Sequence, residues 1–144
     1  MAKLSQIQDV INDVTKTMPI PLYGSKVQAG FPSPADDFIE QHLDLNEYLI
    51  QHPAATFLVR AKGQSMINAG IFSGDILIVD KSLEPTHGKI VIAAIDGELT
   101  VKRLYRKDGV VKLQPENPDF PDLDISEQGE TIIWGVVTNV IRDV

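Results

Sequence analysis

The chain has 144 residues, of which 43% are apolar and 23% charged, as expected of one soluble globular domain. Its 13 Lys and Arg against 20 Asp and Glu give a net charge of −7, which disfavours direct binding to the phosphates of nucleic acid. The absence of cysteine excludes disulfides, thiolate metal sites and cysteine nucleophiles. No apolar run approaches the ~18 residues that span a bilayer, and the N-terminus lacks a secretory-signal pattern. We therefore expect a cytoplasmic protein without membrane contact.

The N-terminal part of the chain is expected to be an extended tail. Prolines punctuate the first 36 residues and forbid a long regular element there: Pro19, Pro21, Pro32 and Pro34. Residues 4–14 carry apolar side chains at helical spacing, which indicates at most a short amphipathic turn.

One short helix is predicted after this tail. Asp44 and Glu47 have the spacing of a capping box, in which Asp44 accepts hydrogen bonds from the first-turn N–H groups and Glu47 reaches back. Pro53 ends any helix that begins there.

From residue 56 onward the chain reads as β-structure. Short runs of β-branched and apolar residues predict strands over 56–62, 75–80, 89–96, 98–106, 110–113 and 131–140. Asp96-Gly97 and Asp108-Gly109 are typical of two-residue hairpin turns, because a type I′ turn needs positive φ at both positions. The prolines within 115–121 predict a loop, and Gly135 predicts a bend or bulge in the last strand. The fold class is therefore mostly β, a strongly curved domain with an extended N-terminal tail and one short helix.

Histidine offers no catalytic or metal-binding pattern. His42, His52 and His87 share no metal-ligand spacing and nothing points to a Ser-His-Asp triad, so we expect structural or solvated histidines. No metal and no cofactor is predicted.

Ser65 follows a glycine directly after a predicted strand. A strand that stops at Gly63 and then presents a serine can expose a hydroxyl beside free backbone N–H groups. The alternative is an ordinary turn serine.

Lys102 lies inside a predicted strand, next to Arg103. Alternation sends the two side chains to opposite faces, so one cation points into whatever face is covered. Only a lysine can act there as a base, since arginine stays protonated, and the lysine pKa falls only in a mostly apolar pocket. The alternative is an edge lysine whose amine reaches solvent.

Several segments, in order, resemble the LexA/UmuD family of self-cleaving Ser-Lys peptidases: 63–66 (GQSM), 74–80 (GDILIVD), 87–88 (HG) and 99–104 (LTVKRL). Upstream, the stretches 27–34, 44–46 and 51–56 are similar to the UmuD branch of that family. The resemblance covers most of the chain, from residue 20 to residue 142.

The resemblance implies a specific site. Ser65 would be the nucleophile, Lys102 its general base, and backbone N–H groups around Gly63, Gln64 and Ser65 would hold the oxyanion. The cleaved bond would join Ala29 to Gly30, where UmuD proteins commonly have Cys-Gly and LexA-type repressors Ala-Gly. Residues 1–29 would then be a removable tail, and 30–144 the peptidase-fold domain.

The implied function is that of a UmuD-like protein of the SOS response to DNA damage. It would remove its own tail and then serve, as a homodimer, as the accessory subunit of an error-prone translesion DNA polymerase. The implied partners are RecA on single-stranded DNA, which provokes cleavage, and a UmuC-type polymerase, with no direct contact to nucleic acid.

Two other hypotheses compete with this one. A LexA-like repressor needs a DNA-binding domain before the cleavage site, and 29 residues with a net charge of about +1 leave no room for a helix-turn-helix. A non-catalytic interaction or dimerisation domain of the same fold stays open as the alternative. The tail could reach its own dyad or a neighbour's, since either lies within the span of the extended chain.

Overall fold

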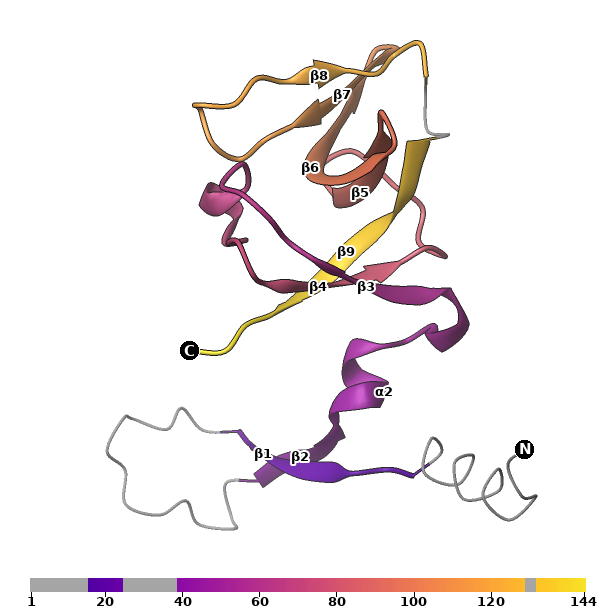
Figure 1. Cartoon of the computed structure of the whole chain (residues 1–144). Coiled ribbons are helices and arrows are strands. Elements are labelled where there is room, and N and C mark those ends of the chain that lie inside the picture. Colours follow the sequence, from indigo (N-terminus) through magenta and orange to yellow (C-terminus); the bar gives the residue numbers. More distant parts are fainter. Residues whose placement is uncertain (1–15, 25–38, 129–131) are drawn as a thin grey trace, which may run out of the picture. The chain divides into compact units, whose positions relative to one another are not determined.

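The computed structural model describes residues 16–24, 39–128 and 132–144, and the chain divides into two units, Met1–Tyr48 and Leu49–Val144 (Figure 1). The amphipathic turn expected over 4–14 and the Ala29–Gly30 bond lie outside the described residues. The predicted division after residue 29 therefore stays a prediction.

The first unit contains a two-stranded antiparallel sheet that the sequence did not predict. Strand β1 (Pro19–Tyr23) pairs with β2 (Ile39–Asp44), with Pro19 opposite Asp44. A strand tolerates proline where the missing N–H faces away from its partner, and Pro19 and Pro21 share one edge because strand residues alternate. The prolines thus exclude a helix here without excluding an edge strand.

The predicted short helix follows β2 as α2 (Leu45–Leu49). Asp44 caps it, since its Oδ1 accepts hydrogen bonds from the N–H groups of Asn46 at 3.0 Å and Glu47 at 3.3 Å. Its Oδ2 accepts the N–H of Met18 at 2.7 Å, and this bond is the main cause that lowers the Asp44 pKa. The predicted capping role of Asp44 is confirmed.

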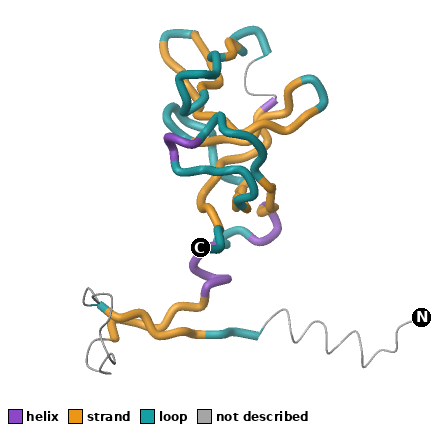
Figure 2. Tube along the Cα trace, turned by 60° about the vertical axis from the view of Figure 1, so that its left-hand side comes forward, coloured by secondary structure: helices purple, strands orange, loops and turns teal. Residues whose placement is uncertain are grey.

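The second unit is built on one seven-stranded antiparallel sheet with the strand order β3-β4-β9-β5-β6-β7-β8. Figure 2 shows the strands in orange and the loops that connect them in teal. The prediction of a mostly β domain is confirmed. Among the strands of this sheet, only β8 was not predicted. The unit also contains two short 3-10 helices, η2 (Pro53–Ala55) and η3 (Ile67–Ala69). The strands are β3 (Thr56–Arg60), β4 (Ile76–Asp80), β5 (Ile90–Ile95), β6 (Glu98–Lys107), β7 (Val110–Gln114), β8 (Leu123–Asp124) and β9 (Ile133–Ile141).

Both predicted Asp-Gly hairpin turns are present. Asp96 and Gly97 have φ of 50° and 80°, and they join β5 to β6. Asp108 and Gly109 have φ of 52° and 78°, and they join β6 to β7. Positive φ at both positions is what a type I′ turn requires, so these pairs set the register of β6.

The predicted irregularity at Gly135 is also present, because β9 shifts register against both neighbours. On β5 the partner changes from Gly135 to Ile133. A Cβ atom on Gly135 would stand 2.7 Å from Val79 Cγ1. The glycine therefore permits β4 and β9 to approach closely where the sheet curves.

Strand β5 contributes to two hydrophobic clusters of the second unit, because its residues alternate between them. One cluster holds Met66, which follows the predicted nucleophile and is only 2% exposed. Its buried members are Ala61, Met66, Ile71, Leu77, Val79 and Ile92. The other cluster consists of Val91, Ala93, Leu104, Leu113, Ile125 and Val136. In the described part of the chain, no helix combines the length and hydropathy of a membrane span.

Candidate active site

Ser65 lies in the loop between β3 and η3, where the sequence predicted an exposed hydroxyl. Gly63 turns the chain with a φ of 86°, and its N–H donates a hydrogen bond to Ser73 Oγ at 3.3 Å. On the other side, Met66 is anchored in the core. Ser65 is thus held between a turn that favours glycine and a buried side chain.

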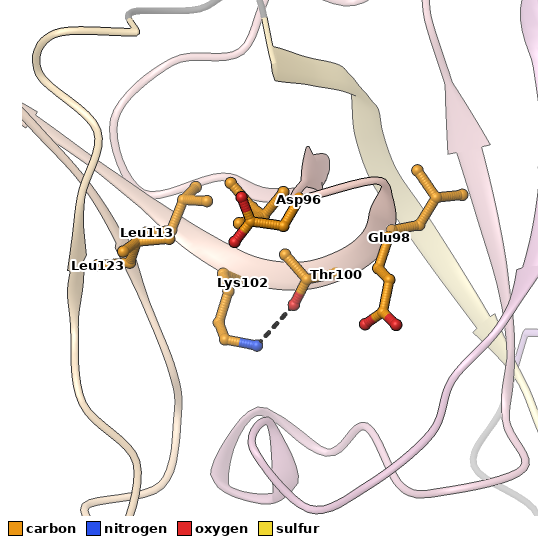
Figure 3. Close-up of a pocket in the computed structure, with 8 residues that line it drawn as sticks. Asp96, Glu98, Thr100, Lys102, Leu113 and Leu123 are labelled. Atoms are coloured by element: carbon orange, nitrogen blue, oxygen red, sulfur yellow. Dashed lines mark hydrogen bonds between the residues drawn. The ribbon is translucent and has the colours of Figure 1, made fainter.

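Lys102 extends from β6 to this loop. Its Nζ donates hydrogen bonds to Ser65 Oγ at 3.1 Å, to Thr100 Oγ1 at 2.8 Å and to Val101 O at 3.0 Å (Figure 3, which shows the bond to Thr100). The structure therefore brings together the two residues that the sequence singled out, which are 37 positions apart.

The three oxygen atoms around Lys102 define what a neutral amine can do. A neutral amine has two N–H donors and one lone pair. The Val101 carbonyl can only accept, and the Thr100 hydroxyl is placed to accept as well, so both N–H groups have partners. The lone pair is then directed at Ser65, where it can accept the hydroxyl proton.

The environment favours this neutral form. Burial lowers the pKa of Lys102 from its ordinary value of 10.5. At a given pH, a larger fraction of the Lys102 amine is therefore uncharged than of the amine of a solvated lysine. The arrangement matches a serine nucleophile with an adjacent base.

Two cavities meet at Lys102. The smaller, of about 120 Å³, also contacts Ser65, and both apolar residues, among them Ala61, Leu77 and Ile92, and the charged residues Arg60 and Lys62 line it. The larger, of about 490 Å³, is lined by Asp96, Glu98 and apolar residues that include Leu113 and Leu123 (Figure 3). A small cavity beside a nucleophile accepts small side chains, and a larger one gives room for neighbouring residues of a peptide.

The proline-rich loop after β7 supports the nucleophile loop. The N–H of Glu116 donates to Ser65 O at 2.8 Å, and the Glu116 carbonyl accepts from Asn68 N at 2.9 Å. The Asn117 Nδ2 donates to Gln64 O at 2.9 Å. The sequence predicted only a loop here, and the sole signal was an asparagine between two prolines.

Arg103 connects the same loop to the strand that carries Lys102. Its guanidinium donates to the Glu116 carboxylate, and also to the Gly88 carbonyl at 2.6 Å. The two adjacent cations therefore have different partners, as their alternation predicted, because Lys102 contacts the nucleophile and Arg103 the loop behind it.

Arg142 holds the far end of the segment that contains Ser65. Its guanidinium donates two hydrogen bonds to the Asp75 carboxylate, at 2.7 and 2.6 Å, and one to Gly70 O at 2.6 Å. Asp75 is 2% exposed, and the Arg142 bonds are the main cause that lowers its pKa to about 2. A buried carboxylate with a bidentate partner fixes this segment.

Two histidines have partners other than the Ser65–Lys102 pair. His52 Nδ1 lies 2.6 Å from Asp80 Oδ2, and His87 Nδ1 accepts the N–H of Arg106 at 3.0 Å. Among residues 16–24, 39–128 and 132–144, no group of three His, Asp or Glu side chains is placed to hold a metal ion.

Comparison with known proteins identifies the family of this chain. Residues 21–138 match the Peptidase S24-like family. The chain belongs to the S24-like peptidases. It is 52% identical to Protein ImpA of Salmonella typhimurium over 122 residues, which are 85% of the chain and 83% of that protein. It is 47% identical to Protein MucA of Escherichia coli over 121 residues, 83% of the chain and 82% of that protein.

The chain is also 42% identical to the LexA repressor of Erwinia tasmaniensis over 125 residues, 86% of the chain but 61% of the repressor. ImpA, MucA and SamA are UmuD-like proteins of SOS mutagenesis. The predicted membership of the LexA/UmuD family is therefore confirmed, and this S24-like peptidase is a self-cleaving serine peptidase of the UmuD type.

Proposed function

We propose that this S24-like peptidase cleaves its own chain between Ala29 and Gly30 with Ser65 as nucleophile and Lys102 as general base. The observation that supports it most is the 3.1 Å hydrogen bond between Lys102 Nζ and Ser65 Oγ, together with the two further acceptors that orient the amine. Removal of residues 1–29 would leave 30–144 as the processed protein.

The proposed bond belongs to the segment between Tyr23, the last residue of β1, and Ile39, the first of β2. Because the two strands pair, the ends of this segment are held close together. Alanine and glycine are small, which suits the cavity of about 120 Å³ beside Ser65. Pro32 and Pro34 would disfavour a helix directly after the bond.

The reaction follows from the hydrogen-bond partners of Ser65 and Lys102. Neutral Lys102 takes the proton from the Ser65 hydroxyl as Oγ attacks the Ala29 carbonyl carbon, which gives a tetrahedral oxyanion. Of the N–H groups predicted to hold it, that of Gly63 donates to Ser73, which leaves those of Gln64 and Ser65. The protonated Lys102 then gives its proton to the departing Gly30 nitrogen, and water hydrolyses the acyl-enzyme.

Cleavage would also divide the first unit. Strand β1 lies in the part to be removed, and β2 in the part to be retained, so the two strands would lose their covalent connection. Their pairing would then depend on noncovalent bonds alone, which lowers the effective concentration of one strand for the other.

The partners follow from the UmuD type. The processed protein would act as a homodimer and as accessory subunit of an error-prone UmuC-type polymerase in the cytoplasm. RecA on single-stranded DNA would provoke cleavage by favouring a conformer in which the tail is docked on the dyad.

Self-cleavage is tested by incubating the full chain without other proteins at pH ~10, near the pKa of a free lysine, and measuring intact masses. A fragment that begins at Gly30 is expected. Ser65→Ala and Lys102→Ala should each abolish it, whereas Lys107→Ala, at the last residue of β6, should leave it unchanged. Cleavage that persists in Lys102→Ala, or a fragment that begins elsewhere, would contradict the proposal.

A further inference from the structure

The Asn117 side chain is held in one orientation behind the nucleophile loop. The residue is 8% exposed, and its Oδ1 accepts the N–H of Asp119 at 3.1 Å. Because that contact fixes the oxygen, the Nδ2 end must face the Gln64 carbonyl, to which it donates at 2.9 Å. Among the described residues, the other donor to this carbonyl is the N–H of Ile67, at a longer 3.4 Å.

A carbonyl and the N–H of the next residue share one planar peptide unit and point in opposite directions. Holding the Gln64 carbonyl towards Asn117 therefore directs the Ser65 N–H away from Asn117. Within the part of the chain that the structure describes, that N–H has no hydrogen-bond acceptor. The Ser65 N–H is thus an oriented donor that is free to bind an acceptor, and it belongs to the same residue as the predicted nucleophile.

We propose that Asn117 is a positioning residue for the peptidase reaction, because its side-chain amide holds the peptide unit that presents the Ser65 N–H to the oxyanion. This inference rests on the proposed function of Ser65 and Lys102. A donor that is already aimed needs no reorganisation when charge develops on the substrate oxygen, which makes orientation of this peptide unit a contribution to the rate.

The rest of the loop makes this support rigid. The Glu116 N–H holds the next carbonyl, that of Ser65, and the Glu116 side chain is held by Arg103 on β6. Strand β6 thereby positions the base directly through Lys102 and the nucleophile loop indirectly through Arg103. Asn117 adds a hydrogen bond to the peptide unit between Gln64 and Ser65, which carries the Ser65 N–H.

Two substitutions test the inference. Asn117→Asp keeps the shape and the acceptor for Asp119 but replaces the donor by a carboxylate oxygen. Asn117→Ser adds no charge and is too short to reach Gln64, so it decides the matter if Asn117→Asp does not fold. The control is Gln114→Glu, which makes the same change of charge where the side-chain amide bonds the exposed carboxylate of Asp122.

The readout is the rate of self-cleavage of the full chain across pH, with folding checked by circular dichroism and urea unfolding. The expected result for folded Asn117→Ser is a plateau rate at least about tenfold lower, with the pH midpoint unchanged, since loss of an oxyanion donor costs about 100-fold or more. Gln114→Glu should keep the plateau rate.

Two results would overturn the inference. One is a folded Asn117→Ser protein with the plateau rate of the unsubstituted chain, and the other is a rate loss produced only by a shift of the midpoint, which would mean that Asn117 acts through Lys102. Failure of the unsubstituted chain to produce the Gly30 fragment would instead refute the proposed function, so the two failures are distinguishable.

Discussion

Thr100 and Lys102 lie on the same face of β6, and a 2.8 Å hydrogen bond joins their side chains (Figure 3). The threonine is two residues from the lysine, the spacing at which strand side chains point the same way. With the Val101 carbonyl it occupies both N–H groups of a neutral amine, which leaves the lone pair for Ser65.

Thr100→Val, which keeps the shape and removes the hydroxyl, is expected to lower the plateau rate of self-cleavage by about tenfold, or ~1.4 kcal/mol of barrier. The hydroxyl also accepts from the charged amine, so its loss should lower the Lys102 pKa and move the pH midpoint down. Rates of Gly30-fragment formation across pH measure both effects. Thr138→Val on β9 is the matched control, and an unchanged plateau in Thr100→Val would show that the hydroxyl does not orient the amine.

The pH dependence of self-cleavage follows from the direction in which burial shifts the Lys102 pKa. Burial lowers this pKa from 10.5, and only the neutral amine can accept the Ser65 proton. The rate should therefore rise with pH and level off above a midpoint that lies below 10.5. Initial rates from neutral to alkaline pH, measured by intact mass, give the midpoint. A rate that falls with pH would mean that the charged amine is the active form.

Gly30→Glu should block cleavage. In the proposed arrangement, the substitution would place a large charged side chain directly after the bond to be cut, where the cavity beside Ser65 holds only about 120 Å³. Gly30→Ala is the size control and should still be processed, because a methyl group adds little bulk and no charge. The measurement is intact mass after incubation at pH ~10. Normal processing of Gly30→Glu would mean that the bond lies elsewhere.

The elements that the sequence predicted depend on neighbours along the chain. The Asp96-Gly97 and Asp108-Gly109 turns need only positive φ at two adjacent residues, and the β5–β6 and β6–β7 pairs follow from them. The meeting of Ser65 and Lys102 was expected from the family resemblance, because spacing along the chain alone does not bring a strand lysine to a loop serine.

What the sequence did not predict depends on contacts between distant residues. Strand β9 lies between β4 and β5. No local sequence pattern indicates with which earlier strands the last strand of a sheet will pair. The sequence does not predict strand β1, because Pro19 and Pro21 usually interrupt regular structure, although an edge strand tolerates them where their nitrogens face outward. The support of Gln64 by Asn117 joins loops 53 positions apart and leaves no periodic trace.

The Asp75–Arg142 ion pair should make the stability of the second unit depend on pH in the acid range. The folded-state pKa of Asp75 is about 2, below its ordinary 3.8, so the pair contributes stability fully above pH ~3.8. That contribution should be lost as the pH falls from 3.8 towards 2, and urea midpoints across this range measure it. Asp75→Asn should remove this part of the pH dependence. Arg142→Lys should reduce it, because an ammonium cannot make the bidentate contact.

Gly135→Ala should destabilise the second unit. The added Cβ would stand 2.7 Å from Val79 Cγ1 and 3.1 Å from the Asp80 carbonyl, and Val79 is fully buried, so the methyl group overpacks this part of the sheet. The expected cost is about 1–3 kcal/mol, the usual range for overpacking a core, measured by urea unfolding at neutral pH. Thr138→Ala, at an exposed position of the same strand, should change stability much less. Equal stability of the Gly135→Ala and unsubstituted proteins would show that β4 and β9 can separate at the bend without cost.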